Sequence, residues 1–304
     1  MSSWKDNMKI PLISGIKRHS LEDGPGIRTV AFFKGCPLRC VFCHSPETQG
    51  EGIEIGFNPV HCIGCGDCIT ACSSDAVDDN FVINLLKCSK CGDCVEVCPG
   101  SAKYLIGKEI PVDDLVQILM RDRNYHEHSG GGVTLSGGEC TMFPDYLEDL
   151  LKRLKEEGAN TLLETCGHFD MEKFKRNILP YLDGVYFDLK LSDPVDHEKY
   201  TGVKNDRILE NLSRLAMERS IDLKVRTPLI PGITDTEENL RGIKRIADDL
   251  GIENLEFLPY NPFCLESARR IGRVPPDLPD HFADVDETKE IGERIRTIFK
   301  KPLT

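Results

Sequence analysis

Residues 29–44 read TVAFFKGCPLRCVFCH, an apolar β-type run that passes into three closely spaced cysteines. The three are Cys36, Cys40 and Cys43, with the spacing C-x3-C-x2-C. A four-iron cluster held by three thiolates keeps one iron without a protein ligand, and an open coordination position distinguishes a catalytic metal site from a closed structural one. The spacing alone leaves a second interpretation open, in which the three cysteines pack together or bind zinc with His44.

Two further groups of four cysteines each have the spacing C-x2-C-x2-C-x3-C, and the second group is followed by Pro99. This spacing is that of bacterial two-cluster ferredoxins, in which the fourth cysteine of each group binds the other cluster. We therefore expect one four-iron cluster on Cys62, Cys65, Cys68 and Cys98. We expect the second on Cys88, Cys91, Cys94 and Cys72. Two structural zinc sites are the alternative, but zinc takes four ligands per site rather than overlapping triplets with a delayed fourth.

Composition limits the class of protein. The chain has 304 residues, 14 of them cysteines, and its 38 basic and 50 acidic residues give a formal net charge of −12. Such an acidic chain is poorly suited to nucleic acid, which requires basic surface to displace counterions. The sequence has no apolar run of membrane-spanning length and no signal-peptide core, so we expect a cytoplasmic protein with no membrane partner. Cytosolic thiols are normally reduced, and this favours metal binding over disulfides.

The pattern of strands and helices predicts the fold. Outside residues 54–105, short β-rich runs alternate with amphipathic helical patterns such as 144–157 and 236–250. The expected strands are residues 29–35, 133–136, 161–165, 184–190, 223–230 and 255–260. Alternating strands and helices predict a parallel sheet, and six units predict an open, partial (β/α)6 barrel. We therefore expect an α/β barrel domain from residues 1–53 and 106–304, and an inserted ferredoxin-like α+β domain at 54–105.

The end of every expected strand carries, or is followed by, polar or glycine-rich residues, at the edge where parallel sheets bind their ligands. After the first strand these are the three cysteines, and the others lie at later strand ends. In chain order they are Gly137, Gly138, Glu139, Glu164, Thr165, Asp188, Lys190, Arg226 and Asn261. Six strand ends with such chemistry predict one common site. The three remaining cysteines, Cys140, Cys166 and Cys264, are expected to pack as small apolar side chains.

At these residues the chain resembles the glycyl-radical enzyme activating proteins of the radical S-adenosylmethionine (SAM) superfamily, in the subgroup with a double-cluster ferredoxin-like insert. The similarity extends nearly end to end. It is carried by DGPGIRTVAFFKGCPLRCVFCH (23–44), SGGGVTLSGGE (129–139), YFDLKLSDPVDHEKYTGV (186–203), RTPLIPGITD (226–235) and LEFLPY (255–260). Each motif is moderately specific, and their order and spacing together are very specific.

The resemblance implies where SAM binds. Cys36, Cys40 and Cys43 match the ligands of the radical-generating cluster, whose open iron is chelated by the amino and carboxylate groups of SAM. Phe42 occupies the usual aromatic position beside the last ligand. Gly137, Gly138 and Glu139 match the motif that receives the methionine amino group. Asp188 and Lys190 match the family DLK, in which the lysine faces the methionine carboxylate.

Other positions carry further roles by resemblance, with two departures from the family pattern. Glu164, Thr165 and Asp188 map near a monovalent-cation site of shorter relatives, where the first position is usually Asp. Asn261 replaces a frequent histidine that contacts the cofactor, and an amide can hydrogen-bond but cannot titrate. Asp23 matches an aspartate linked to binding of the glycyl loop, and Arg226 lies where the family contacts ligand or peptide.

The implied activity is that of an oxidoreductase that reductively cleaves SAM to a 5′-deoxyadenosyl radical. This radical takes a hydrogen atom from a glycine of a partner glycyl-radical enzyme. The implied cofactors are three 4Fe–4S clusters and SAM, with a monovalent cation as a further candidate, and the implied electron donor is a flavodoxin or ferredoxin. One alternative is a radical SAM enzyme acting on a small molecule or another peptide. A ferredoxin-like electron carrier is the non-enzyme alternative, and it leaves the three-cysteine site unexplained.

Overall fold

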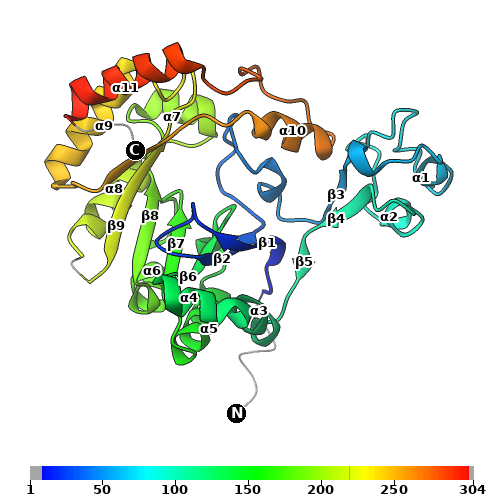
Figure 1. Ribbon diagram of the computed structural model, residues 1–304, viewed down its shortest axis with the longest axis horizontal. Coiled ribbons are helices and arrows are strands. Elements are labelled where there is room, and N and C mark those ends of the chain that lie inside the picture. Colours follow the sequence, from blue (N-terminus) through cyan, green and yellow to red (C-terminus); the bar gives the residue numbers. More distant parts are fainter. Residues whose placement is uncertain (1–8, 219, 301–304) are drawn as a thin grey trace.

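A computed structural model describes residues 9–218 and 220–300, and Figure 1 shows its arrangement. Over these residues eight strands form one sheet in the order β10-β9-β8-β7-β6-β2-β1-β5. Six of them are parallel neighbours, namely β2 (Arg28–Phe33), β6 (Gly132–Gly137), β7 (Thr161–Thr165), β8 (Gly184–Asp188), β9 (Asp222–Pro228) and β10 (Leu255–Leu258). The predicted α/β fold with a mostly parallel sheet is therefore confirmed.

Helices alternate with the strands along the chain, and most of them cover the outer face of the sheet (Figure 1). They are α3 (Val112–Leu119), α4 (Arg123–Ser129), α5 (Pro144–Glu156), α6 (Met171–Asn177), α7 (Pro194–Thr201), α8 (Asp206–Ala216), α9 (Glu237–Leu250), α10 (Phe263–Arg270) and α11 (Val285–Phe299). Alternate strand residues such as Leu135, Phe187 and Val225 are buried in the core with Leu147 and Leu150 of α5. Because side chains alternate across a strand, the residues between them lie on the other, inner face of the sheet.

Two strands at one edge of the sheet were not expected from the sequence. β1 (Leu12–Ser20) pairs antiparallel with β2, and the two-residue β5 (Lys108–Glu109) pairs antiparallel with β1. The β1–β2 pairing has irregularities between Ile13 and Gly15 and between Lys17 and Ser20. Such irregularities shift the side-chain register, so the strand lacks the regular alternation by which a sequence pattern is recognised.

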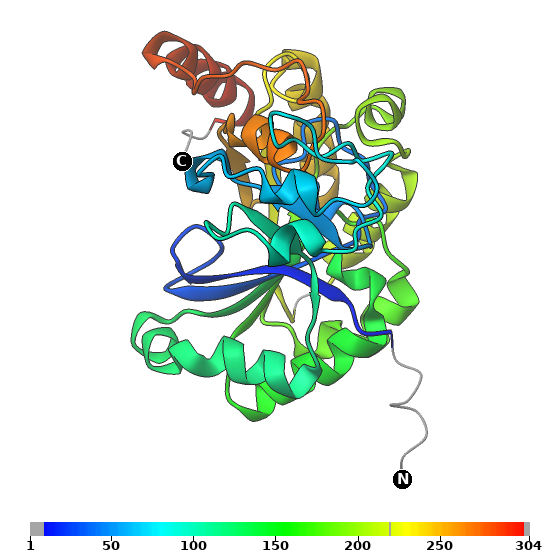
Figure 2. The same ribbon diagram turned by 90° about the vertical axis from the view of Figure 1, so that its right-hand side faces the viewer.

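Residues 54–106 form a separate lobe, which projects to the right in Figure 1 and faces the viewer in Figure 2. We call it the cysteine-rich lobe, and we call the rest of the described chain the body. The lobe contains β3 (Glu54–Phe57), which pairs antiparallel with β4 (Lys103–Ile106), and the short helices α1 (Asp67–Thr70) and α2 (Asp93–Glu96). The two helices begin in the same way, after Gly66 and Gly92, whose φ angles of 81° and 94° favour glycine.

Charged side chains, including the buried Lys34 and Glu54, join the lobe to the body. The carboxylate of Glu54, at the start of β3, accepts from Lys34 Nζ at 2.7 Å and from Arg273 Nη2 at 2.7 Å. Lys34 directly follows β2, and Arg273 lies beyond α10. Glu54 therefore links three segments that are distant in sequence, at the base of the loop that carries Cys36.

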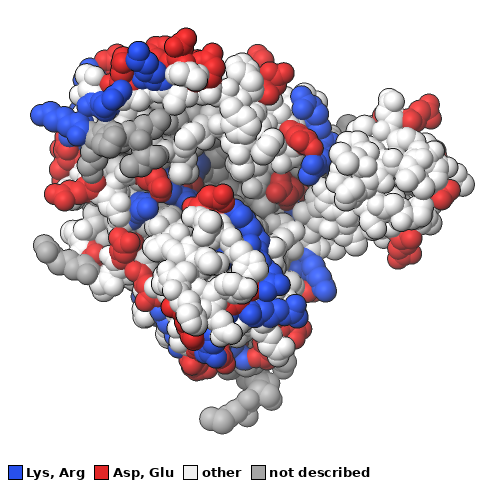
Figure 3. Space-filling view, in the orientation of Figure 1, with Lys and Arg blue, Asp and Glu red and all other residues white. Residues whose placement is uncertain are grey.

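No helix in residues 9–218 and 220–300 is long and apolar enough to cross a membrane. The surfaces of the two parts differ in charge. In the view of Figure 3 the body carries many acidic and basic side chains, whereas the lobe on the right shows few.

Candidate functional site

The three-cysteine loop follows β2 at the C-terminal edge of the parallel strands. Its backbone is held by the end of α7, since Arg39 N donates to Thr201 O at 2.7 Å and Val41 N donates to Tyr200 O at 2.9 Å. The loop packs into a second apolar cluster. That cluster contains Leu38, Cys40, Phe42, Cys166, Ile230, Tyr260, Cys264 and Leu265, with Cys36 and Cys43 against it. The predicted ligands therefore lie together in surroundings that limit access of water.

The two glycines after β6 allow this strand end to approach the cysteine loop. Gly138 N donates to Phe33 O at 2.8 Å, and Glu139 N donates to Gly35 O at 2.7 Å. A Cβ on Gly138 would lie 2.2 Å from Gly35 O. Gly137 has a φ of 107°, and a Cβ there would lie 2.4 Å from Phe33 N. Larger residues at either position would therefore push the strand end away from the loop.

The side chain of Glu139 is fully buried and hydrogen-bonded within the protein. Its carboxylate accepts from Thr141 Oγ1 at 2.6 Å, from Thr165 Oγ1 at 2.9 Å and from Cys166 N at 2.7 Å. These bonds tie the end of β6 to the end of β7. The resemblance predicts that this motif receives the methionine amino group, and the structure adds a positioning role for the Glu139 carboxylate.

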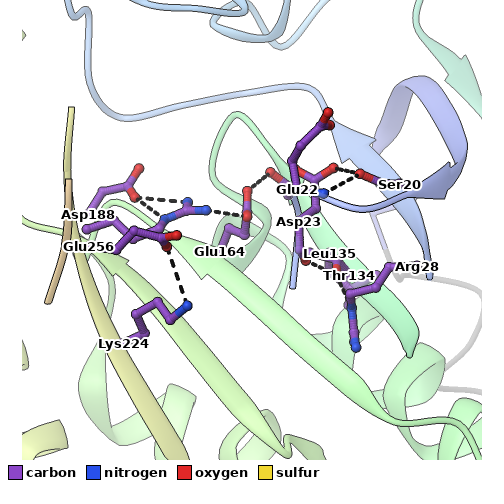
Figure 4. Close-up of polar contacts among 12 residues, drawn as sticks. Ser20, Glu22, Asp23, Arg28, Thr134, Leu135, Glu164, Asp188, Lys224 and Glu256 are labelled. Atoms are coloured by element: carbon purple, nitrogen blue, oxygen red, sulfur yellow. Dashed lines mark hydrogen bonds and ion pairs between the residues drawn. The ribbon is translucent and has the colours of Figure 1, made fainter. Parts of the chain in front are cut away.

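A network of charged side chains crosses the inner face of the sheet (Figure 4). Arg226 of β9 lies between two carboxylates, with Nη1 at 2.5 Å from Glu164 Oε1 and Nη2 at 3.0 Å from Asp188 Oδ1. Ser136 Oγ donates to Glu164 Oε2 at 2.6 Å, and Lys190 Nζ lies 3.1 Å from Asp188 Oδ2. Four neighbouring strands thus bring together residues that the sequence placed at separate strand ends.

This network bears on the candidate cation site. The guanidinium of Arg226 pairs with the carboxylates of both Glu164 and Asp188, and Lys190 adds a second positive charge beside Asp188. Thr165, the third residue mapped to the site, donates its hydroxyl to Glu139 instead. Although burial acts against it, Asp188 and Glu164 raise the pKa of Arg226 above its ordinary value. The side chains mapped to a cation site are therefore occupied by partners from the chain itself.

Lys190 connects the network to the cysteine loop. Burial acts against its charge, but Asp188, Cys40 and Cys166 raise the pKa of Lys190. Burial raises the pKa of Cys40 to about 11, and Lys190 opposes this rise. A hydrogen bond from the Cys166 thiol lowers the pKa of Cys36. Cys166, predicted only to fill space, is therefore also a neighbour of a predicted ligand.

Asp23 and Asn261 lie at opposite ends of this inner face. The loop of Asp23 covers the inner face of β6, since its carbonyl accepts from Thr134 Oγ1 at 2.7 Å (Figure 4). Lys17 Nζ lies 3.2 Å from the Asp23 carboxylate. Asn261 follows β10, where its Oδ1 accepts from Phe263 N at 3.0 Å and its side chain hydrogen-bonds His44. Asn261 thus lies against the cysteine loop. Asp23 lies beside Thr134 of β6, farther from the C-terminal ends of the strands.

One group of cysteines in the lobe surrounds a recess. Its lining includes four cysteines, and these are Cys62, Cys65, Cys68 and Cys98. The set joins the first three cysteines of the first group to the last cysteine of the second, as the ferredoxin spacing predicts. Ala76 N donates to Cys72 Sγ at 3.2 Å, and Lys103 N donates to Cys98 Sγ at 3.5 Å.

The other cysteines of the lobe show a matching arrangement. Burial raises the pKa of Cys94 to about 11, and Cys88, Cys72 and Cys68 add to the rise. Burial also raises the pKa of Cys68, with further contributions from Cys98 and Cys62. In the described residues no three His, Cys, Asp or Glu side chains converge on one ion. Thiolates of a four-iron cluster bind different irons, so they surround a space rather than meet at a point.

Comparison with known proteins identifies the family. The profile of the radical SAM superfamily matches residues 30–242. The isethionate sulfite-lyase activating enzyme of Oleidesulfovibrio alaskensis is 38% identical, over 91% of this chain and 92% of its own. The choline trimethylamine-lyase activating enzyme of the same organism is 36% identical, over 86% and 87%. The trans-4-hydroxy-L-proline dehydratase activating enzyme of Clostridioides difficile is 39% identical, over 83% and 84%.

The chain belongs to the radical SAM superfamily, in the family of glycyl-radical enzyme activating enzymes. As a radical SAM protein it uses a 4Fe–4S cluster and SAM. The radical SAM match begins in β2 and ends in α9, so it includes the cysteine loop, Glu139 and the Arg226 network. Sequence reasoning missed the links of Arg226 to two carboxylates and of Glu54 to two cations, because both depend on contacts between distant segments.

Proposed function

We infer that this protein activates a glycyl-radical enzyme by forming a radical on one glycine of that partner. The observation that carries this function is the identity of 35–39% to activating enzymes over most of both chains. The names of these relatives refer to different partner enzymes, so they support the class of reaction rather than one partner. The fold we propose is a partial (β/α)6 barrel, built on the six parallel strands.

Within the barrel, the residues of this chain hold and orient the cofactors. We assign Cys36, Cys40 and Cys43 as ligands of the radical-generating cluster, since they lie together under an apolar cover. When bound and reduced, this cluster and SAM supply a 5′-deoxyadenosyl radical. Lys190 supports binding of the methionine carboxylate, because its ammonium faces the cysteine loop and stays charged. Gly137 and Gly138 bring the β6 backbone against the loop, where it can receive the methionine amino group.

The inner face of the sheet is the place we propose for the partner's glycine loop. Arg226 and Asp23 lie on this face, which carries charged and hydroxyl side chains from four strands. Phe42 and Asn261 lie near the cysteine loop and would contact SAM. We propose that Arg226 supplies the positive charge between Glu164 and Asp188, with no separate monovalent cation required there.

We further propose that residues 54–105 are a ferredoxin-like domain with two 4Fe–4S clusters, inserted between residues 1–53 and 106–304. The recess lined by Cys62, Cys65, Cys68 and Cys98 supports the first cluster. The grouping of Cys94 with Cys88 and Cys72 supports the second. Electrons would come from a flavodoxin or ferredoxin, and oxygen-sensitive clusters suit an anaerobic cytoplasm.

The experiment that tests the function uses the reconstituted full chain under anaerobic conditions with SAM and a reductant. Candidate glycyl-radical enzymes are added one at a time, and electron paramagnetic resonance detects the glycyl radical. We expect the glycyl doublet in one partner, with one 5′-deoxyadenosine formed per radical. SAM cleavage without a doublet in any candidate would favour the alternative, a radical SAM enzyme that acts on a small molecule or another peptide.

A further inference from the structure

Lys103, the first residue of β4, has a buried side chain in a lobe with a very small core. Lys34 and Lys103 are 0% and 1% exposed, so both ammonium groups are removed from water. Lys34 has a buried carboxylate partner in Glu54, at 2.7 Å. For Lys103, no carboxylate lies within ion-pair distance in the described part of the chain. A buried ammonium without a negative partner is costly, so this difference requires an explanation.

The contacts that Lys103 does make are with neutral groups. Its Nζ donates to the carbonyl of Phe81, and it lies 4.3 Å from the centroid of the Phe57 ring. The Phe81 carbonyl accepts from one of the three donors of the ammonium, and the Phe57 ring offsets part of its charge. They do not supply the negative charge that a buried cation needs.

Cysteine thiols are the groups around Lys103 that can become negative. Those that act most strongly on its ammonium are Cys68, Cys94, Cys62 and Cys98. Three of these four line one recess, and Lys103 lines the same recess. Cys94 belongs to the other predicted ligand set. Lys103 therefore lies in the recess of the first set, and Cys94 of the second set is close enough to act on its charge.

We propose that the ammonium of Lys103 is the built-in counter-charge of the cluster held by Cys62, Cys65, Cys68 and Cys98, and that it raises the reduction potential of this cluster. The proposal rests on the two-cluster lobe proposed above. Four thiolates outweigh the charge of a four-iron core, so the bound cluster is an anion and becomes more negative on reduction. A fixed nearby cation stabilises the reduced form more than the oxidised form, and net charge is one factor that sets these potentials.

The proposed role concerns a one-electron step. One electron from a donor of the flavodoxin or ferredoxin class enters the cluster, no bond is broken and no proton is required. With its potential raised, the cluster beside Lys103 accepts an electron more readily than it would without this ammonium.

The test uses the full chain with Cys36, Cys40 and Cys43 replaced by Ala, so that only lobe clusters contribute signals. Midpoint potentials are measured by redox titration with dithionite, monitored by electron paramagnetic resonance. We expect Lys103→Met to lower the equilibrium constant for reduction of one cluster about tenfold. This corresponds to a midpoint potential lower by about 59 mV for a one-electron couple. Lys103→Arg keeps the positive charge, so its midpoint potential should remain close to that of the chain with Lys103. Lys87→Met removes an exposed charge from the same lobe and should have little effect, because solvent screens it.

The direction of the shift separates the charge from a purely structural role. If Lys103 only packs the lobe, Lys103→Met admits water, which stabilises the more negative reduced cluster and raises its potential. An unchanged or raised potential would overturn the proposal, and so would equal shifts in the Met and Arg variants. If Lys103→Met loses a cluster that Lys103→Arg keeps, the charge is again responsible. Loss in both variants assigns the effect to shape and rejects the proposal.

Iron content separates this proposal from the assignment of the lobe. The background chain should hold about eight irons, four in each lobe cluster. A background chain that binds no iron would overturn the two-cluster lobe and the role of Lys103 together. Eight irons with an unmoved potential would reject only the role of Lys103.

Discussion

The body and the cysteine-rich lobe are stabilised in different ways. The body buries one continuous apolar core, which extends from Ile13 in β1 to Phe299 in α11. The core of the lobe consists of Ile55, Cys68, Val77, Ile83 and Cys94, so two of its five buried side chains are predicted metal ligands. A domain of this size with so few apolar residues usually needs a metal or disulfides to fold. The body is therefore expected to fold through burial of apolar surface, and the lobe through what its cysteines bind.

Removal of iron should produce the largest difference between the lobe and the body. Chelation of the reduced protein under anaerobic conditions is expected to unfold the lobe and leave the body folded, because ligand binding and folding are coupled in small metal domains. Hydrogen exchange measured by mass spectrometry should show lost amide protection in α1 and α2. Peptides of α5 in the same sample serve as the control and should keep theirs. Unchanged protection of α1 and α2 would show that the lobe folds without its clusters.

Breaking the ion pair between Glu54 of the lobe and Lys34 of the body should have the next largest effect. Glu54→Gln leaves Lys34 buried without its charged partner, and breaking a buried ion pair costs about 3–5 kcal/mol. Urea denaturation of the body, followed by fluorescence, measures the loss. Glu237→Gln is the matched control, since Glu237 and Arg241 are 61% and 57% exposed and such pairs contribute less than about 1 kcal/mol. Equal losses in both variants would mean that the Glu54 link does not hold the lobe against the body.

The smallest effect is expected at a cysteine of the body that is not a predicted ligand. Cys166→Ala removes a buried thiol beside Cys36, and we expect the chain to keep about twelve irons and lose about 1 kcal/mol of stability. Iron analysis and thermal denaturation measure the two quantities. A loss of about four irons would instead identify Cys166 as a ligand of the radical-generating cluster.

The parts of the fold that the sequence predicts are those with a local pattern. The six parallel strands and helices such as α5 were expected close to their observed bounds, because apolar residues recur there with the period of a strand or helix. β1 and β5 were not expected. β1 has an irregular register, and the two residues of β5 are a strand only because β1 lies beside them.

The candidate site likewise has features that a local sequence pattern predicts and features that depend on contacts between distant segments. Cysteine spacing and strand ends pointed to Cys36, Glu164, Asp188 and Arg226 from sequence alone. That Arg226 lies between the two carboxylates depends on the relative register of β7, β8 and β9, which no local pattern encodes. The burial of Lys103 among cysteines of both groups likewise follows from the fold of the lobe. A lone lysine at the start of the short run KYLI was the one local sign of it.

The central claim is that radical chemistry takes place at the three-cysteine loop of the body, with the lobe holding two separate clusters. Its most direct test is the full chain with Cys36, Cys40 and Cys43 replaced by Ala, reconstituted with iron and sulfide, reduced and mixed with SAM. Cys140→Ala, a buried cysteine outside every predicted ligand set, is the control. We predict about eight irons and no 5′-deoxyadenosine for the triple variant, and about twelve irons with full cleavage for the control. Continued formation of 5′-deoxyadenosine by the triple variant would contradict the account.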